Sequence, residues 1–326
     1  MPVPKRILYI FSFSKAQIRF LKYCLGFFIP VVLAYLALEL LVLNIPINYK
    51  LFGKYLETHS QEIEVMGLGS SQVKCGFNPE FCDKTAINLA STSQHHNEDF
   101  NILKGTVYRL PKLKYVLLEL SYNHLELPHH PDDYWKNTIY LKYYNVNAFE
   151  RPTWFKDRLV YLSNAHFYSH ILMDYYFYKT NKTELNEYGF DTNNHEGAFK
   201  KLNYDESKIA THKFKIITRE DLDIFKKNTA YFFKMLDYAK TEDLKVIVCT
   251  LPLYKTYLKE RNQNIVRRRD SVLKIIKSKY KNVVLLNEET DTLNFTANDF
   301  LNENHLNPDG AKKFTDLINR KLDSLN

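Results

Sequence analysis

The chain has 326 residues, of which 45% are hydrophobic and 25% are charged, and its formal net charge is +8. This composition excludes a disordered or low-complexity chain, and the length allows one large domain with an accessory region. Much of the positive charge is local, because the first 22 residues contain five basic side chains and no acidic one. A second basic run, Arg267-Arg268-Arg269, is interpreted as a solvated helix face. The charge leaves nucleic-acid binding open as an alternative, but we expect no nucleic-acid partner.

An apolar segment near the N-terminus predicts a membrane anchor. Tyr23–Leu43 is 21 residues long and contains a single charge, Glu39. About 20 apolar residues span a bilayer core as a helix, and a proline such as Pro30 is tolerated there. The preceding basic residues predict that the N-terminus stays in the cytoplasm. We therefore expect a cytoplasmic tail over residues 1–22, a single transmembrane helix over 23–43, and a C-terminal domain that is periplasmic or extracellular.

Two other interpretations of this segment are less favourable. A cleaved signal peptide would have a shorter apolar region followed by a small-x-small site. The stretch Leu40–Pro46 offers no such site. A buried helix of a soluble protein remains the other alternative, although the length and the basic flank favour a membrane span.

The cysteines point to structural roles. Cys75 and Cys82 lie seven positions apart in the part predicted to be outside, where they could form a local disulfide in an oxidising compartment. Cys249 lies in an apolar run and is interpreted as a core residue. The sequence has no CxxC pair, which argues against a zinc site made of thiolates. We expect no cofactor.

The region 60–326 alternates apolar runs with helical patterns. A long helix is expected from Thr218 as N-cap, with Asp221 completing an imperfect capping box, and another from about Thr256 to Tyr280. A last helix should begin with Asn307 as N-cap and Pro308 as its first residue. This alternation predicts an α/β domain of three layers with a flavodoxin-like parallel sheet. The five expected strands are 63–68, 85–90, 115–120, 245–251 and 282–286.

An aromatic-rich segment interrupts this alternation at about residues 129–215. It contains both tryptophans, Trp135 and Trp154, and the cluster Tyr175-Tyr176-Phe177-Tyr178. Its patterns are short and helical, so we interpret it as an insertion over the carboxyl ends of the strands, where open α/β sheets bind ligands. The aromatic side chains could stack on sugar rings, form a small core of their own, or lean on the membrane surface.

Two short motifs at the ends of these elements predict a nucleophile and a base. Gly67-Leu68-Gly69-Ser70-Ser71 places serines on a turn after the first strand, and His305 stands in the loop before the last helix. A serine hydroxyl is a poor nucleophile unless a nearby base takes its proton, and imidazole titrates in the right range for that task. A side-chain amide after the third strand, Asn123, could donate to an oxyanion.

Other ligand sites fit the sequence less well. A dinucleotide fingerprint would need a third glycine at Gln72 and an acid after the second strand, and a P-loop would need Gly-Lys-Ser/Thr. The pairs His95-His96 and His129-His130 raise the possibility of zinc, but neighbouring histidines rarely point both rings at one ion. We therefore predict no metal site.

Over residues 60–326 the constellation resembles the SGNH (GDSL-type) hydrolase superfamily. The resemblance implies Ser71 as nucleophile and His305 as base, with Asn123 and the backbone N–H of Ala90 at the oxyanion hole. The run GSSQVKCGFNP and the anchor are most similar to the membrane-anchored envelope branch, which includes alginate acetylation proteins and the D-alanine transfer protein of teichoic acids. The four matching blocks are Gly69-Ser70-Ser71, Ala90-Ser91, Ser121-Tyr122-Asn123-His124 and Asn302-Glu303-Asn304-His305.

Two positions depart from the family pattern. Asn302 stands where the family has the aspartate that orients the histidine, and an amide cannot supply the charge of a carboxylate. Ala90 replaces the glycine of the second block. Either the site works as a Ser–His dyad, or Asp299 or Glu303 reaches the ring, or the protein is an inactive relative.

The leading hypothesis is a membrane-anchored, extracytoplasmic SGNH-like serine esterase or O-acyltransferase. Its substrate would be an acyl ester, with acetyl as the expected group, on an envelope or exported polysaccharide. The resemblance alone implies a membrane-bound acyltransferase partner. The alternative is a non-catalytic carbohydrate-binding or assembly protein that keeps the fold.

Overall fold

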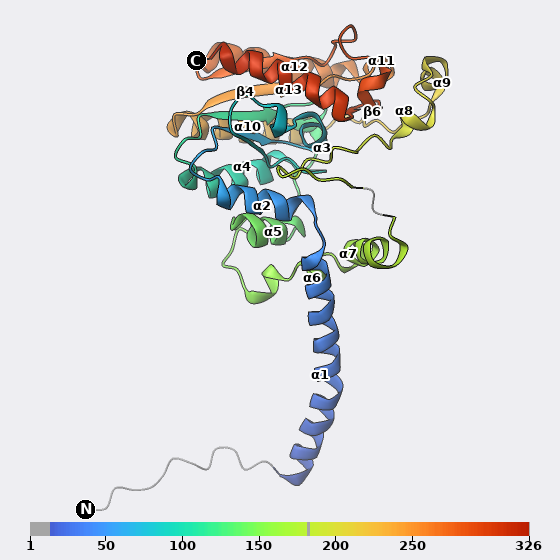
Figure 1. Ribbon diagram of the computed structural model, residues 1–326. Coiled ribbons are helices and arrows are strands. Elements are labelled where there is room, and N and C mark those ends of the chain that lie inside the picture. The colour runs from blue at the N-terminus through green and yellow to red at the C-terminus, as the bar shows by residue number, and fades with distance from the viewer. Residues whose placement is uncertain (1–13, 181–182, 326) are drawn as a thin grey trace, which may run out of the picture. The chain divides into compact units, whose positions relative to one another are not determined.

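The computed structural model describes residues 14–180 and 183–325, and these fall into two compact units (Figure 1). Within the described residues, the first unit contains 14–45 together with Leu159–Lys179. The second contains Pro46–Arg158 and the chain from Thr180 onward. The second unit holds the whole sheet and every residue predicted to form the site.

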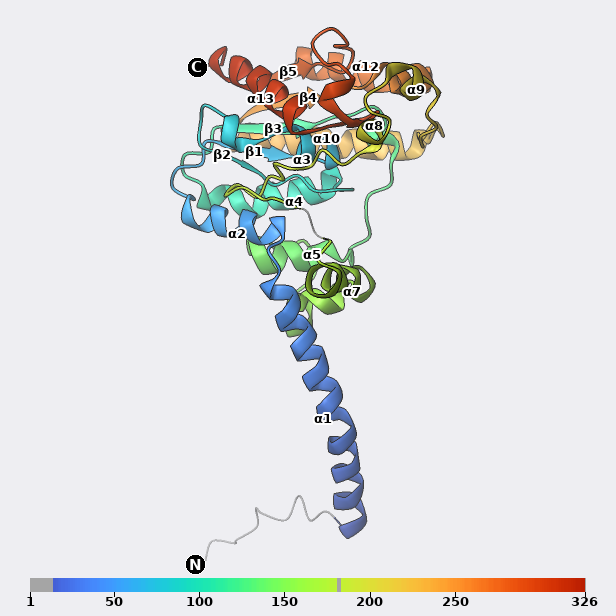
Figure 2. The same ribbon diagram turned by 45° about the vertical axis from the view of Figure 1, so that its right-hand side comes forward.

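A parallel sheet of five strands organises the second unit, in the order β2-β1-β3-β4-β5. Figure 2 shows the strands in this order. The register places Leu68 beside Leu118, so β1 and β3 end next to each other. This arrangement confirms the predicted three-layer α/β fold. The strands are β1 (Val65–Leu68), β2 (Ala86–Asn88), β3 (Tyr115–Glu119), β4 (Lys245–Thr250) and β5 (Val283–Asn287).

Helices cover both faces of the sheet. On one face, α3 (Ser71–Gly76) packs against α13 (Pro308–Asp323), and Val65 of β1 belongs to the core beneath them. The next residue, Met66, points to the opposite face, where its sulfur meets the Thr106 hydroxyl at the end of α4 (His96–Thr106). Helix α10 (Leu222–Thr241) packs on α4 and β4, and α12 (Gln263–Lys279) packs on β5.

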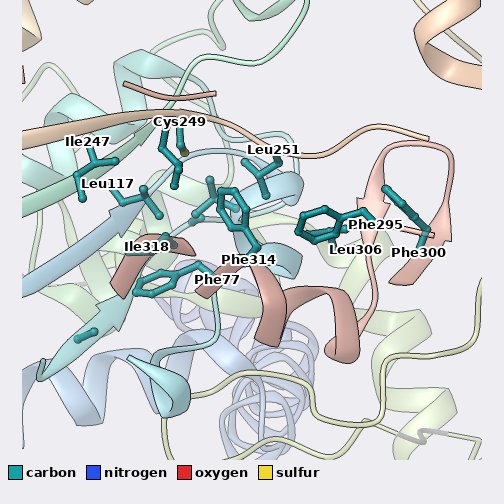
Figure 3. Packing of buried hydrophobic residues seen from close by; sticks show 14 of the residues in the cluster. Phe77, Leu117, Ile247, Cys249, Leu251, Phe295, Phe300, Leu306, Phe314 and Ile318 are labelled. Atoms are coloured by element: carbon teal, nitrogen blue, oxygen red, sulfur yellow. The ribbon is translucent and has the colours of Figure 1, made fainter. Parts of the chain in front are cut away.

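The core between the sheet and α13 is apolar and fully enclosed. Leu117 and Ile247 project from the central strands, and Phe314 and Ile318 meet them from α13 (Figure 3). Cys249 lies in the same cluster, as the apolar run around it predicts. All four cysteines, including Cys75 and Cys82, are free thiols in the structure.

Two predicted helix boundaries are wrong. Asp221, not Thr218, is the N-cap of α10, because its carboxylate accepts from the Ile224 N–H at 3.0 Å. The helix expected over 256–280 is broken into α11 (Lys255–Glu260) and α12. Asn262 lies at the break, where its side chain caps α12 and its N–H donates to the Tyr122 hydroxyl at 2.7 Å.

The interpretation of Arg267-Arg268-Arg269 as a solvated face is also corrected. Arg269 is buried and pairs with Glu289 at 2.7 Å. Arg268 pairs with Glu126 and Glu220 across from α12. Two of the three guanidinium groups are therefore held by carboxylates of the protein itself.

Short helices make up most of the predicted insertion. One part, 194–212, lies beside the hairpin formed by β6 (Phe300–Asn302) and β7 (His305–Leu306), since His212 Nδ1 contacts Glu303 Oε1 at 2.6 Å. Another part, Leu159–Lys179, belongs to the first unit. The insertion includes α5 (Lys136–Ile139), α6 (Val160–Ser163), α7 (Ala165–Leu172), η6 (Met173–Tyr178), α8 (Ala198–Lys201) and α9 (Glu206–Thr211), whereas α2 (Asn48–Thr58) precedes β1.

The first unit is dominated by α1 (Lys15–Asn44), which contains the predicted span Tyr23–Leu43. It is the one helix within the described residues that is long and apolar enough to cross a membrane. The helix begins with Ser14, whose side chain accepts from the Gln17 N–H in a capping box. The basic residues Lys5 and Arg6 of the predicted tail lie outside the described residues.

Candidate active site

Ser71 is held on a tight turn between β1 and α3. Gly69 has φ +145°, and a Cβ at this position would lie 2.7 Å from the Glu119 side chain, so only glycine fits. Ser70 caps α3 and Ser71 is its first residue. The backbone N–H of a first helical residue has no acceptor within its helix. The turn therefore carries a hydroxyl and a backbone donor on the same residue.

His305 lies opposite this serine. Its Nε2 is 2.7 Å from the Ser71 Oγ, within hydrogen-bond distance. The ring is carried by β7, and Asn307 caps α13 directly afterwards by accepting from the Gly310 N–H at 3.0 Å. The predicted cap and first helical proline are confirmed. The structure thus brings together two residues 234 positions apart in sequence.

Asn302 occupies the position of the orienting acid. It pairs with His305 across the β6–β7 hairpin, and its Oδ1 lies 3.0 Å from the histidine Nδ1. The same oxygen accepts the backbone N–H groups of Asn304 and His305, each at 3.1 Å. Backbone N–H groups only donate, so they require the amide oxygen, not the amide nitrogen, to face them.

This orientation of Asn302 determines the tautomer of His305. An acceptor oxygen on Nδ1 requires that nitrogen to carry the proton, and the lone pair is then on Nε2, facing the Ser71 hydroxyl. The amide therefore orients the base without supplying a negative charge. Burial lowers the pKa of His305 to about 4, so the ring is neutral at pH 7 and able to take a proton.

Neither of the other candidate acids reaches the histidine ring. Asp299 accepts from the Thr296 N–H and from Lys313 Nζ, at 2.8 and 2.9 Å. Glu303 is buried and pairs with His212. Both carboxylates are engaged in stabilising the hairpin region, which leaves Asn302 as the residue on Nδ1.

A buried carboxylate beneath the turn, Glu119, was not singled out from the sequence. It accepts the Ser70 N–H at 2.6 Å and the hydroxyls of Ser70 and Ser121 at 2.8 and 2.6 Å. Glu119 is fully buried. Its charge raises the pKa of His305, but the burial of the histidine ring lowers that pKa by more. A signal was present in the sequence, because Glu119 is the one charged residue in the apolar run Tyr115–Leu120.

The two predicted oxyanion residues have different placements. Asn123 follows β3 and is half-buried, and β3 is the neighbour of the strand that leads to Ser71. The Ala90 N–H donates to Asn88 Oδ1 at 3.1 Å. This N–H is therefore bonded within the loop after β2. That the Ala90 N–H and the Asn123 amide donate to an oxyanion stays a prediction.

A second polar group fixes the loop after β2. Lys136 is buried and its Nζ donates to the Ser91 Oγ at 2.7 Å and to the carbonyl oxygen of Thr92. The Tyr49 hydroxyl lies 2.7 Å from the same Ser91 oxygen. Burial, with a smaller contribution from Lys74, lowers the pKa of Lys136 to about 7.

The histidines considered as metal ligands in the sequence lie in a cluster of rings that contact one another edge-on or at a tilt. His95 lies 5.3 Å from His124 and 5.0 Å from His130 between ring centroids, and His96 lies 4.2 Å from His124. Burial lowers the pKa of His95 to about 2 and that of His129 to about 4, so both are neutral at pH 7. In residues 14–180 and 183–325, no group of three or more His, Cys, Asp or Glu side chains could hold a metal ion.

Comparison with known proteins gives structural neighbours only. No family model and no curated protein matches the chain. A solved structure described as an acylhydrolase from Bacteroides fragilis NCTC 9343 is 12% identical, with a TM-score of 0.39, over 83% of this chain and 95% of that one. A GDSL-like lipase from Bacteroides thetaiotaomicron VPI-5482 is 12% identical, with a TM-score of 0.40, over 84% and 98%.

A third structure, described as a platelet activating factor from Streptococcus pneumonia, is 10% identical, with a TM-score of 0.39, over 84% of this chain and 91% of that one. Similarity at this level is weak, so the chemistry of the site rests on its own residues.

Proposed function

We propose that this protein is a serine esterase or O-acyltransferase that works through a Ser71–His305 pair with Asn302 as a neutral orienting residue. The observation that supports it most is the chain of contacts from the Ser71 Oγ to His305 Nε2, at 2.7 Å, and from His305 Nδ1 to Asn302 Oδ1, at 3.0 Å. Nucleophile, base and orienting group in hydrogen-bond contact are the arrangement that serine acyl transfer requires.

The reaction follows from this geometry. The Ser71 Oγ attacks the acyl carbonyl carbon while its proton passes to His305 Nε2, and the carbonyl oxygen becomes an oxyanion. The backbone N–H of Ser71 and the amide of Asn123 stabilise that oxyanion. The C–O bond to the alcohol then breaks, and the alcohol leaves with the proton from His305. Water or a sugar hydroxyl next gives its proton to His305 and attacks the acyl carbonyl carbon on Ser71. The bond between that carbon and the Ser71 Oγ then breaks, and His305 returns the proton to the Ser71 Oγ.

The substrate and location are the finer part of the proposal. The apolar helix α1 and the basic residues around its start support an anchor with a cytoplasmic N-terminus and an extracytoplasmic domain. A site outside the cytoplasm, together with the resemblance to the envelope branch, supports acyl groups on an envelope or exported polysaccharide. The resemblance also supports a membrane-bound acyltransferase as the source of acyl groups.

A non-catalytic binding or assembly role is the second candidate. The observation that favours it is Asn302, because an inactive relative has no need for a carboxylate beside the histidine. The ordered hydrogen bonds on both nitrogens of His305 favour the catalytic role.

Two experiments test the proposal. The purified chain should hydrolyse an activated acetyl ester, and Ser71→Ala and His305→Ala should each abolish that turnover, whereas the half-exposed neighbour Lys74→Ala should remain active. Equal turnover by Ser71→Ala and the wild type would refute the nucleophile. The second experiment fuses reporter enzymes after Asn326. A reporter that works only outside the cytoplasm should be active there, and one that works only in the cytoplasm should be inactive. Activity of a cytoplasm-specific reporter there would refute the anchor orientation.

A further inference from the structure

The segment Leu159–Tyr178 has a composition unusual for an exposed helical segment. Its 20 residues contain one formally charged side chain, Asp174. Tyr168 and Leu172 are buried, but the Phe177 and Tyr178 side chains are 72% and 65% exposed, and Leu162, Phe167 and Met173 are also exposed. A surface helix normally shows water a polar face. This segment instead shows apolar and aromatic side chains over much of its surface.

Hydrogen bonds attach the segment to α1 in the first unit. The two carboxylate oxygens of Glu39 accept the N–H groups of Val160 and Tyr161, at 2.8 and 2.7 Å. These are the first N–H groups of α6, which have no partner within their own helix. At the other end of the segment, the Tyr176 hydroxyl donates to the Leu41 carbonyl oxygen at 3.1 Å. Glu39, the single charge of the predicted span, is thereby buried and used as a cap.

These bonds place the segment beside the last turns of α1. Glu39 and Leu41 lie four and two residues before Leu43, the last residue of the predicted span, which is about 6 and 3 Å at 1.5 Å per residue. Interfacial helices lie about 5–10 Å into the boundary between headgroups and acyl chains. Figure 1 shows α6 and α7 at the C-terminal end of α1, and Figure 2 shows α7 there as well.

We propose that α6, α7 and η6 form an interfacial membrane element that lies in the outer leaflet beside the end of the α1 anchor. This inference rests on the membrane anchoring proposed above. The occupant of the exposed apolar surface is lipid, because α6 and α7 pack against α1, whose Leu40 and Leu41 side chains are exposed as well. Tyrosine is typical of this depth, since its ring is apolar and its hydroxyl meets water.

The element would add a second membrane contact to a single helix. Its attachment through Glu39 and Tyr176 couples the anchor to the polypeptide between η5 (Phe155–Arg158) and α8, so the catalytic chain is tied to the membrane at two places in its sequence. A partner membrane protein is the competing occupant of the same surface.

Photo-crosslinking to lipid tests the assignment. The full-length protein alone is reconstituted into nanodiscs of phosphatidylcholine and phosphatidylglycerol with a phospholipid that carries a diazirine in its upper acyl chain. After irradiation, peptide mapping locates the lipid adducts. We expect adducts on 15–44 and on 160–178. Leu293, the 91% exposed leucine of the second unit, serves as the control for exposure alone and should carry none.

A pair of variants tests the attachment. Glu39→Ala should reduce adducts on 160–178 several-fold while those on α1 remain, and Glu57→Ala, an exposed glutamate of α2, should change neither. If Glu39→Ala does not fold, the wild-type map still decides. Adducts on α1 with none on 160–178 would overturn this inference and leave the anchor intact, and would point to a protein partner instead. A reconstituted chain without adducts on α1 would overturn both the interfacial element and the membrane anchor.

Discussion

The side-chain oxygen of Asn302 lies 3.0 Å from His305 Nδ1 and is held there by two backbone N–H groups of its own hairpin. In a serine protease triad, replacing the acid by an amide costs about 10⁴ in rate through the wrong histidine tautomer. Here the hairpin prevents the amide from presenting its nitrogen, so the tautomer is the productive one. Compared with an aspartate at the same position, Asn302 lacks only the negative charge.

Asn302→Asp should therefore raise esterase activity by much less than about 10⁴, because the tautomer is already correct. Asn302→Leu, which keeps the size but removes the acceptor, should lose far more activity than Asn302→Asp gains. Steady-state kcat/KM for the three proteins on one acetyl ester checks this. A gain of about 10⁴ for Asn302→Asp would mean that the Asn302 amide presents its nitrogen, not its oxygen, to His305 in the wild type.

The pH dependence of activity should reflect the environment of His305. Its folded-state pKa is lowered to about 4, so the base is neutral above that pH and is protonated below it. The acid limb of kcat/KM should lie near pH 4 in the wild type. A carboxylate at position 302 favours imidazolium and should move that limb upward by about one to three pH units. The measurement is a pair of pH–rate profiles, and coincident profiles would contradict the account.

Glu119 should be required for both stability and activity. Glu119→Ala would leave three part-buried donors on Ser70 and Ser121 without their acceptor, at up to about 1 kcal/mol for each unsatisfied group. We expect a clear loss of unfolding free energy and a displaced Ser71. Ser121→Ala, which removes one of the three bonds, is the matched control and should cost about 1 kcal/mol. Equal stability of Glu119→Ala and the wild type would show that Glu119 does not support the turn.

Lys136 should make the protein more stable as the pH rises above neutrality. Its folded pKa is lowered to about 7 from 10.5, so between these values the unfolded chain binds more protons and stability increases with pH. Urea unfolding of the detergent-solubilised chain at pH 7 and 8.5 measures this slope. Lys136→Met should flatten it, whereas Lys74→Met, at a half-exposed lysine, should leave most of it. An unchanged slope in Lys136→Met would contradict the assignment of this pH dependence to Lys136.

Local patterns predicted the elements better than the contacts between them. The five strands and the Asn307 cap follow from apolar runs and capping preferences, whereas the proximity of Ser71 and His305 was expected from the resemblance of their motifs. The boundary at Asp221 and the break at Asn262 depend on partners far away in sequence, Glu126 and Tyr122. The capping preferences of Asp and Asn were present in the local sequence, but these distant partners were not.

The polar interior was the harder part of the site to predict. Glu119 and Lys136 are buried charges whose roles depend on the loops that surround them, and a charged residue in a sequence is most often exposed. The attachment of Val160 to Glu39 likewise joins segments 121 residues apart. The extents of the tail, anchor and insertion, and the catalytic roles of the site residues, stay predictions.

The most direct test of the central claim is the reaction of the protein with a fluorophosphonate probe, which labels an activated serine. Intact mass and peptide mapping should show one adduct, on Ser71, in the wild type and in Asn302→Asp. Ser71→Ala and His305→Ala should show none, while Ser70→Ala should still be labelled, if more slowly. A wild-type protein that remains unlabelled, or one labelled equally well without His305, would contradict the account of Ser71 as a nucleophile activated by His305.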